Sequence, residues 1–203
     1  MDDKMPIQYV VWDWNGTLLN DAWVFVYLMN QELHKRKLPA INIHKYRQHF
    51  DFPVKKYYKH LGFDFNKESF EKIGLEFMGK YEKYKYKASL FKESTQVLEQ
   101  IASLGIPQSI ISASQNVLLN DMVNHYKIKH YFEQVGGLTH FFATSKIELA
   151  SKLCAEIQCN NKNILFVGDT LHDFEIASIL NAQSILFSKG HCSIKRLKTT
   201  ITL

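Results

Sequence analysis

Cysteine is scarce in this chain, because only Cys154, Cys159 and Cys192 occur among 203 residues. Their number is odd, and no CxxC pair is present. A disulfide framework needs paired cysteines and a thiolate zinc site needs closely spaced ones, so neither is expected. Reduced thiols are typical of a cytoplasmic protein, and a cytoplasmic location is the expectation.

The sequence also lacks a long hydrophobic run. The longest candidate, residues 22–29, is far shorter than the roughly 20 apolar residues that span a bilayer. The opening MDDKMPIQYV carries two acids and lacks the basic start and cleavage site of a signal peptide. No membrane association is therefore expected. The hydrophobic fraction of 46% is ordinary for a globular protein, and the length allows one core plus a small inserted domain.

Positive charge is present but unevenly distributed. The net charge is +5, and residues 20–90 hold 14 Lys/Arg against 8 Asp/Glu, so the whole excess lies in this segment. One interpretation is attraction of an anionic substrate. The other, favoured for most of these lysines, is a solvated helical surface. No nucleic-acid-binding motif is present, so nucleic acid is not an expected partner.

Strand and helix patterns alternate along most of the chain. Strands are predicted at residues 7–12, 108–111, 132–135, 164–167 and 184–187, with helical stretches between them. This alternation predicts an α/β fold, a Rossmann-like parallel sheet with helices on both faces, formed by residues 1–19 and 91–203. In such sheets the ligand site lies beyond the carboxyl ends of the strands.

Residues 20–90 carry helical patterns and no strand signal. Helices are expected at about 21–37, with Asn20 or Asp21 as the capping residue, and at about 43–49 and 53–61. A longer one, capped by Asn66, would carry an aromatic stripe that includes Phe77 and Tyr81. The stripe is interpreted as packing rather than as a ligand site. The segment is therefore predicted to be an all-helical domain inserted into the α/β core.

The first polar cluster, DWNGTL, directly follows the first predicted strand. A carboxylate at Asp13 can attack phosphorus and form an aspartyl-phosphate. Gly16 permits a tight turn, and the backbone amides around it are candidates to hold phosphate oxygens. Taken alone, the cluster is also compatible with a turn that caps a helix, which is the less favoured interpretation.

The second cluster, GDTLHD, follows the strand ILFV. Asp169 and Asp173 lie four residues apart at a strand-to-helix junction, which suits a magnesium ion because this ion prefers a few carboxylates and several waters. The commoner role of aspartate at such a junction is helix capping.

Two weaker signals lie between these clusters. Ser112 and Ala113 follow the strand QSII, where a hydroxyl and a backbone N–H can bind phosphate. Lys146 precedes a predicted helix and can neutralise charge on a nucleophile and a phosphate. Lys152 competes for that role, and a lone lysine beside a helix start is usually a surface residue.

In this order, the four clusters resemble the haloacid dehalogenase superfamily of phosphatases over nearly the whole chain. The most specific stretches are GDTLHDFEIA and DWNGTLLND, the latter except at one position. The helical insert looks like the cap of the subfamily that includes phosphoglycolate phosphatases and β-phosphoglucomutase. SASQN is similar to the mutase version of the serine cluster.

The resemblance implies a role for each matched residue. Asp13 would be the nucleophile, Ser112 with the neighbouring backbone a phosphate ligand, and Lys146 the charge-neutralising lysine. Magnesium would be the cofactor, held by Asp13, Asp169 and the backbone carbonyl of Asn15, with Asp173 binding directly or through water. A small phosphorylated metabolite would be the substrate. The oligomeric state stays open between monomer and homodimer, because no heptad or evident interface segment is present.

Asn15 departs from the pattern of the family. The phosphatases that this chain resembles carry at that position an aspartate that protonates the leaving group. An amide cannot act as a general acid, whose contribution is roughly 10² to 10⁴ in rate. Either the substrate has a good leaving group, or another group supplies the proton, or the protein binds phosphoesters more than it cleaves them. The histidines conceivable as donors are His34, His44, His49, His60 and His172.

The sequence thus predicts a magnesium-dependent phosphatase with an aspartyl-phosphate intermediate on Asp13. The alternatives are a phosphoester-binding or regulatory protein with weak catalysis and a phosphotransferase. The paired acids Asp169 and Asp173 disfavour a metal-free dehalogenase, and no reactive cap lysine for phosphonate cleavage can be singled out.

Overall fold

The computed structural model describes residues 6–140 and 146–201. Its centre is a five-stranded parallel sheet with the order β5-β4-β1-β6-β7. The strands are β1 (Tyr9–Trp12), β4 (Gln108–Gln115), β5 (Gln134–Leu138), β6 (Ile164–Gly168) and β7 (Gln183–Leu186). The predicted α/β class is therefore confirmed, and β1 occupies the middle of the sheet.

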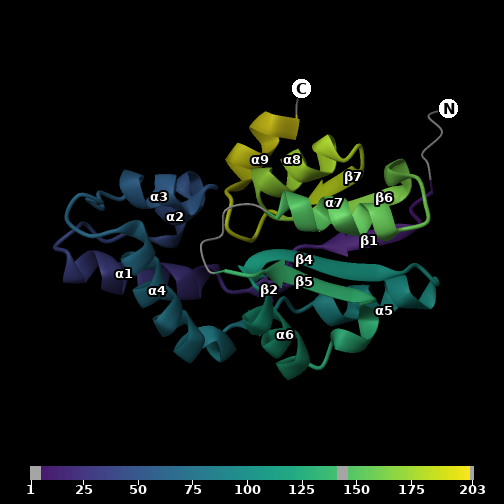
Figure 1. Ribbon diagram of the computed structural model, residues 1–203, viewed down its shortest axis with the longest axis horizontal. Coiled ribbons are helices and arrows are strands. Elements are labelled where there is room, and N and C mark those ends of the chain that lie inside the picture. The colour runs from purple at the N-terminus through teal and green to yellow at the C-terminus, as the bar shows by residue number, and fades with distance from the viewer. Residues whose placement is uncertain (1–5, 141–145, 202–203) are drawn as a thin grey trace.

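Helices cover both faces of the sheet (Figure 1). The helices α5 (Ser94–Ser103) and α6 (Asn116–His125) lie on one face, and α7 (Ile147–Glu156), α8 (Leu171–Ile179) and α9 (Ile194–Ile201) lie on the other. Side chains alternate along β1, so Val10 and Trp12 join one buried cluster while Tyr9 and Val11 join the other. This burial on both faces explains why the strand is an uninterrupted apolar run.

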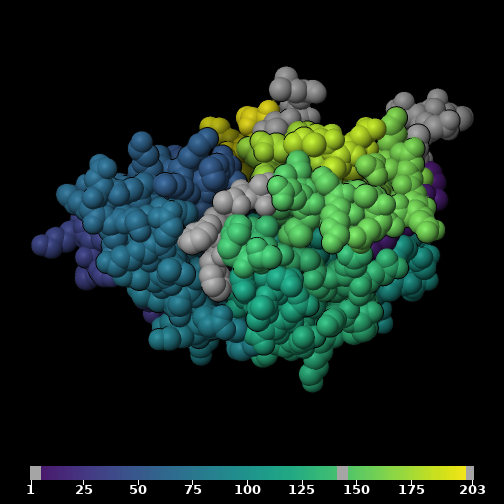
Figure 2. Space-filling view, in the orientation of Figure 1, coloured from purple at the N-terminus to yellow at the C-terminus, as the bar shows by residue number. Residues whose placement is uncertain are grey.

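A group of helices lies beside the sheet, beyond the carboxyl end of β1 (Figures 1 and 2). It consists of α1 (Ala22–Lys35), α2 (Ile43–His49), α3 (Val54–His60), α4 (Phe70–Tyr84) and the short 3-10 helix η1 (Lys85–Lys87). We refer to this group as the cap. Its aromatic stripe on α4 is buried, as predicted, with Phe77 and Tyr81 inside the main cluster. The boundaries of residues 20–90 as a separate domain remain a prediction.

Several local expectations were wrong. The cap of α4 is Ser69, whose Oγ accepts from the Lys72 amide, and not Asn66. A short antiparallel ladder joins β2 (Leu19–Asn20) to β3 (Ser89–Leu90), where no strand signal was found. Two-residue strands carry no periodicity of their own, so pairing between distant segments creates them. This ladder ties together the two ends of the cap segment.

The fourth strand also extends further than predicted. It runs to Gln115 rather than ending at Ile111, so Ser112 and Ala113 lie in the strand and not in a loop. The polar residues at its end pair with β5 through a register shift between Ile111 and Gln115, which pattern alone does not reveal. Within the described residues, no helix is long and apolar enough to cross a bilayer.

Candidate active site

Three carboxylates meet at the carboxyl edge of the sheet. Asp13 follows β1, Asp169 follows β6, and Asp173 lies in the first turn of α8. One oxygen from each lies within 4.8 Å of the others. Because β1 and β6 are adjacent and parallel, their ends bring these separated segments together.

Hydrogen bonds hold Asp173 and Asp169 in fixed positions. Oδ2 of Asp173 accepts from the Thr170 amide at 2.9 Å and the Thr170 hydroxyl at 2.7 Å. Asp173 therefore both caps α8 and faces the cluster. Oδ2 of Asp169 accepts from the His191 amide at 2.5 Å, and Oδ1 accepts from the Thr17 hydroxyl at 3.2 Å.

Lys146 joins the carboxylates from the other side of β1. Its Nζ contacts Asp13, lies 2.7 Å from Oδ1 of Asp173, and donates to the carbonyl of Ile111 at 3.2 Å. Burial alone would lower the pKa of Lys146, but the charges of the two aspartates raise it above its ordinary value. The side chain is therefore a fixed cation. Lys152 is exposed on α7, so Lys146 is the lysine that reaches the cluster.

The cluster holds three carboxylates and one lysine, so its negative charge is not neutralised from within. Burial raises the pKa of Asp13 to about 6, against the opposing effect of Lys146, and the pKa of Asp169 to about 8. Three carboxylates share one full cation, so a divalent ion would relieve their repulsion. An all-oxygen donor set suits a hard cation such as Mg²⁺. The residues therefore fit the expected metal.

The predicted phosphate-binding residues are not all available to a ligand. Ser112 and Ala113 line the cavity above Asp13, and Ser112 Oγ accepts from the Ser114 amide. The Gly16 amide already donates to the Leu19 carbonyl at 2.8 Å and lies 3.1 Å from Oδ1 of Asp21. A phosphate role for that amide is therefore not supported.

The structure gives Gly16 a different role. Its φ is +77°, and a Cβ there would lie 2.4 Å from Oδ2 of Asp169. Only glycine therefore allows this turn to approach the second acidic segment so closely.

Asn15 is held by a complete hydrogen-bond network. Its Nδ2 donates to Oδ2 of Asp21 at 2.6 Å and to the Tyr81 hydroxyl at 3.1 Å, while Oδ1 accepts from the Ser114 hydroxyl at 2.7 Å. Both ends of the amide are thus matched by partners of the right type. This arrangement suits an amide, whose two hydrogens have one acceptor each in Asp21 and Tyr81.

Asp21 is the site residue that sequence reasoning missed. The N-terminal position on α1 suggested a capping role, but its side chain makes no capping bond. The carboxylate is fully buried and accepts from Asn15, Gly16, Tyr81 and, at 3.1 Å, from Nε2 of His191. It therefore connects the turn after β1 to α4 of the cap and to the segment before α9.

His191 was missed for a similar reason, because nothing in its local sequence marks it. Its Nδ1 lies 2.6 Å from the hydroxyl of Tyr46 on α2. Burial would lower the pKa of His191, but Asp21 raises it above its ordinary value. His191 lies 22 residues after Asp169 in the chain, and a separation of this length does not indicate that two residues are in contact.

The histidines that were named as conceivable proton donors differ in position. His34, His44, His49 and His60 are exposed on the cap, and none of them lines the cavity described below. His172 does line it, and burial lowers its pKa.

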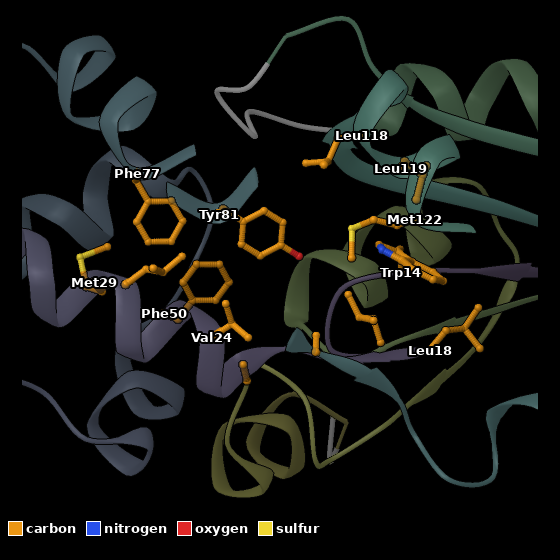
Figure 3. Packing of buried hydrophobic residues seen from close by; sticks show 14 of the residues in the cluster. Trp14, Leu18, Val24, Met29, Phe50, Phe77, Tyr81, Leu118, Leu119 and Met122 are labelled. Carbon is orange, nitrogen blue, oxygen red and sulfur yellow. The ribbon is translucent and has the colours of Figure 1, made fainter. Parts of the chain in front are cut away.

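Trp14 does not face the cap. It is fully buried and packs among core residues such as Met122 (Figure 3).

A cavity lies between the cap and the carboxyl edge of the sheet. We call it the cap cavity. Its volume is about 120 Å³, far above the roughly 15 Å³ that one water needs. The sheet side of its wall carries the polar groups, including Asp13, Asn15, Ser112, Lys146 and Asp169. All three clustered carboxylates line the cavity, and Asp13 is the least buried of them, so it is the most accessible to a ligand.

Solved structures with this fold share little sequence with the chain. A haloacid dehalogenase-like hydrolase from Streptococcus pneumoniae is 20% identical, with a TM-score of 0.78, over 95% of this chain and 90% of that one. A predicted phosphoglycolate phosphatase from Haemophilus somnus is 18% identical, with a TM-score of 0.71, over 93% and 88%. A protein tyrosine kinase from Mycobacterium tuberculosis is 18% identical, with a TM-score of 0.77, over 98% and 100%.

These neighbours carry different names on one architecture, so they establish the fold and not the reaction. A search among curated proteins finds no significant match. A sequence profile described as haloacid dehalogenase-like hydrolase matches residues 10–187, which include all three clustered aspartates, Lys146 and the cap. The chain therefore belongs to the haloacid dehalogenase-like hydrolase family.

Proposed function

We propose that the protein is a magnesium-dependent phosphatase that hydrolyses a small phosphomonoester through an aspartyl-phosphate on Asp13. The observation that carries this proposal is the contact of Lys146 with both Asp13 and Asp173 beside Asp169, at the floor of an accessible cavity. A nucleophile, a fixed cation and a hard-metal donor set then face the same space. The family membership and the names of structural neighbours support a hydrolase of phosphate esters.

In the first step, an oxygen of Asp13 forms a bond to phosphorus while the bond to the leaving oxygen breaks. Lys146 keeps Asp13 ionised and neutralises charge on the transferring group, and Ser112, which lines the cap cavity, would orient a phosphate oxygen. The leaving group departs as an alkoxide or phenolate and takes a proton from solvent. Water then attacks the phosphorus, which releases inorganic phosphate and restores the Asp13 carboxylate.

Asp13, Asp169 and Asp173 would hold Mg²⁺, with the Asn15 carbonyl as a further ligand. When bound, the ion supplies charge neutralisation between phosphate and carboxylates. Asn15 itself cannot donate a proton to the leaving group and recover it. Its fixed amide would instead orient Ser114, with which it shares a hydrogen bond.

Hydrolysis of acetyl phosphate and p-nitrophenyl phosphate, with and without Mg²⁺, tests this function. Both have leaving groups that depart without general acid. Activity should require Mg²⁺ and disappear in Asp13→Asn, whereas Asp51→Asn on the cap surface should retain it. Borohydride reduction during turnover should convert Asp13 to homoserine, detectable by mass spectrometry. Full activity of Asp13→Asn would refute the proposal.

A second function, phosphoester binding with weak catalysis, is favoured by one observation, the fully bonded Asn15 amide. The same experiment separates the two. A regulatory binder would take up phosphoesters with Mg²⁺ and show no Mg²⁺-dependent turnover of either activated phosphate. A phosphotransferase would form the Asp13 adduct and pass phosphate to an added alcohol faster than to water.

A further inference from the structure

The cap contributes an almost entirely apolar wall to the cap cavity. Nine aromatic residues from residues 20–90 line it, together with Met29, Met78, Val54 and Gly74. The rings contact one another: the ring centroids of Phe25 and Phe77 lie 5.4 Å apart, and those of Phe50 and Tyr57 also lie 5.4 Å apart. Figure 3 shows Phe50, Phe77 and Tyr81 gathered on this side. Rings packed on rings form a preorganised wall.

The same wall carries no charge. Residues 20–90 hold 14 Lys/Arg, and none of them lines the cap cavity. Their excess lies elsewhere on the cap; for example, Arg36 and Lys80 pair with Glu32 on α1. Among the described residues, the cationic or potentially cationic side chains in the lining are Lys146, His172 and His191, all on the sheet side. The interpretation of the basic segment as an attractor of an anionic substrate is therefore not supported at this site.

This charge distribution discriminates between kinds of leaving group. A carboxylate or second phosphate beyond the attacked phosphoryl group would lose its hydration against aromatic rings without gaining a cation. An uncharged ring would instead bury apolar area against the wall, which is favourable because this surface is removed from water. The wall therefore favours an uncharged leaving group.

One polar atom in the wall has no partner. The hydroxyl of Tyr57, which is 2% exposed, forms no hydrogen bond with the residues that the structure describes. A buried hydroxyl left without a partner destabilises the protein, because it has lost its hydrogen bonds to water. A ligand with an uncharged hydrogen-bonding group could satisfy it.

Asn15 points independently to the same chemistry. Without a general acid at that position, the leaving oxygen has to depart as an anion, and a phenolate departs far more easily than an alkoxide. The shape of the wall and the missing acid thus favour the same ligand.

We propose that the substrates are phosphomonoesters with an uncharged, largely apolar leaving group, of which aryl phosphates fit best. This inference rests on the phosphatase function proposed above and assigns its specificity to the cap wall of residues such as Phe77 and Met78. Sugar phosphates, and metabolites such as phosphoglycolate whose leaving group carries a carboxylate, are then poor substrates.

The experiment compares phenyl phosphate with 3-carboxyphenyl phosphate, since their phenols have nearly the same acidity and differ in one remote charge. Phenyl phosphate should have at least about a tenfold higher kcat/KM, through a lower KM. Acetyl phosphate, whose leaving group has no ring to pack on the wall, reports the chemistry alone. Equal kcat/KM values for the two aryl esters would overturn the inference. If the wild-type protein does not hydrolyse acetyl phosphate, the phosphatase function itself is refuted.

Variants on α4 locate the effect. Met78 lines the cap cavity and is only half-buried, so Met78→Lys should place a cation in the wall at little cost to folding. In Met78→Lys, the preference for phenyl phosphate over 3-carboxyphenyl phosphate should fall at least about tenfold. Met78→Leu should keep the preference of the wild-type protein. The matched control is Leu75→Lys on the same helix, because Leu75 is 54% exposed and outside the cavity. Equal shifts in Met78→Lys and Leu75→Lys would show that the wall does not set specificity.

Discussion

The side-chain amide of Asn15 lies 2.6 Å from the carboxylate of Asp21, measured between Nδ2 and Oδ2. Asp21 is fully buried and also accepts from Tyr81 and faces His191. The two positions together hold one negative charge, carried by Asp21. A carboxylate at position 15 would meet a second carboxylate at hydrogen-bond distance, whereas the amide of Asn15 donates a hydrogen bond to its neighbour.

Asn15→Asp should therefore create a general acid. Repulsion from Asp21 would raise the pKa of the new carboxyl, so it would keep its proton near neutral pH and donate it to the leaving group. Turnover of alkyl phosphates should rise, by up to about 10² to 10⁴, while aryl phosphates change little. A plot of log kcat/KM against leaving-group pKa should become less steep.

The control for this change is Asn124→Asp, the same substitution on the exposed part of α6. It should leave the plot unaltered. No gain in alkyl phosphate turnover from Asn15→Asp would mean that the proton comes from elsewhere in the wild-type protein.

Asp21→Asn should destabilise the fold strongly. The substitution leaves His191 without its charged partner. It also places an NH2 group either against the donors of Asn15 and Tyr81 or against those of Gly16 and His191, whichever oxygen the amide nitrogen replaces. Removing one partner of a buried pair costs about 3–5 kcal/mol in the free energy of unfolding, which urea titration measures. Asp51→Asn provides the comparison, because the Asp51–Arg196 pair is half-exposed and should contribute about 1 kcal/mol or less. Similar losses in both variants would contradict the role given to Asp21.

Lys146→Met should shift the pH dependence of activity. The charge of Lys146 opposes the effect of burial on Asp13, so its removal raises the pKa of Asp13 further above about 6. A protonated Asp13 cannot attack phosphorus. The acid limb of the kcat/KM profile for p-nitrophenyl phosphate should therefore move to higher pH by about one unit or more. Lys152→Met, on the exposed side of α7, should leave the limb in place.

Magnesium should stabilise the protein more as the pH rises. Burial raises the pKa of Asp13 to about 6 and of Asp169 to about 8, so without the ion the folded state keeps protons that the unfolded chain has released. This stabilising contribution is complete in acid, below the unfolded values, and is lost as the pH rises through about 6 and then about 8. Mg²⁺ replaces these protons, so its binding strengthens over the same range.

Thermal melts with and without Mg²⁺ at constant ionic strength measure this effect. The difference in Tm should grow from about pH 5 to about pH 8. Asp169→Asn should abolish most of the difference. A shift in Tm that is independent of pH in the wild-type protein would exclude binding at this cluster.

Much of this protein could be predicted from the sequence because the signals are local. An apolar run that ends in Asp13 specifies a buried strand followed by a polar turn, and ILFVGD does the same for Asp169. Parallel packing then brings the two ends together, whichever side chains surround them. The meeting of Asp13 and Asp169 follows from this geometry, and the roles of nucleophile and magnesium ligand remain predictions for the experiments above.

Other features were decided only by the tertiary structure. The sequence alone did not distinguish Lys146 from Lys152, and it gave Asp21 only a capping role. Both questions depend on which side chain reaches across from a neighbouring element. The aromatic stripe was interpreted as packing, yet in the fold it is also the wall of a cavity without cap charges. Local patterns record the burial preference of each residue, whereas the partner that it meets depends on contacts between segments far apart in the chain.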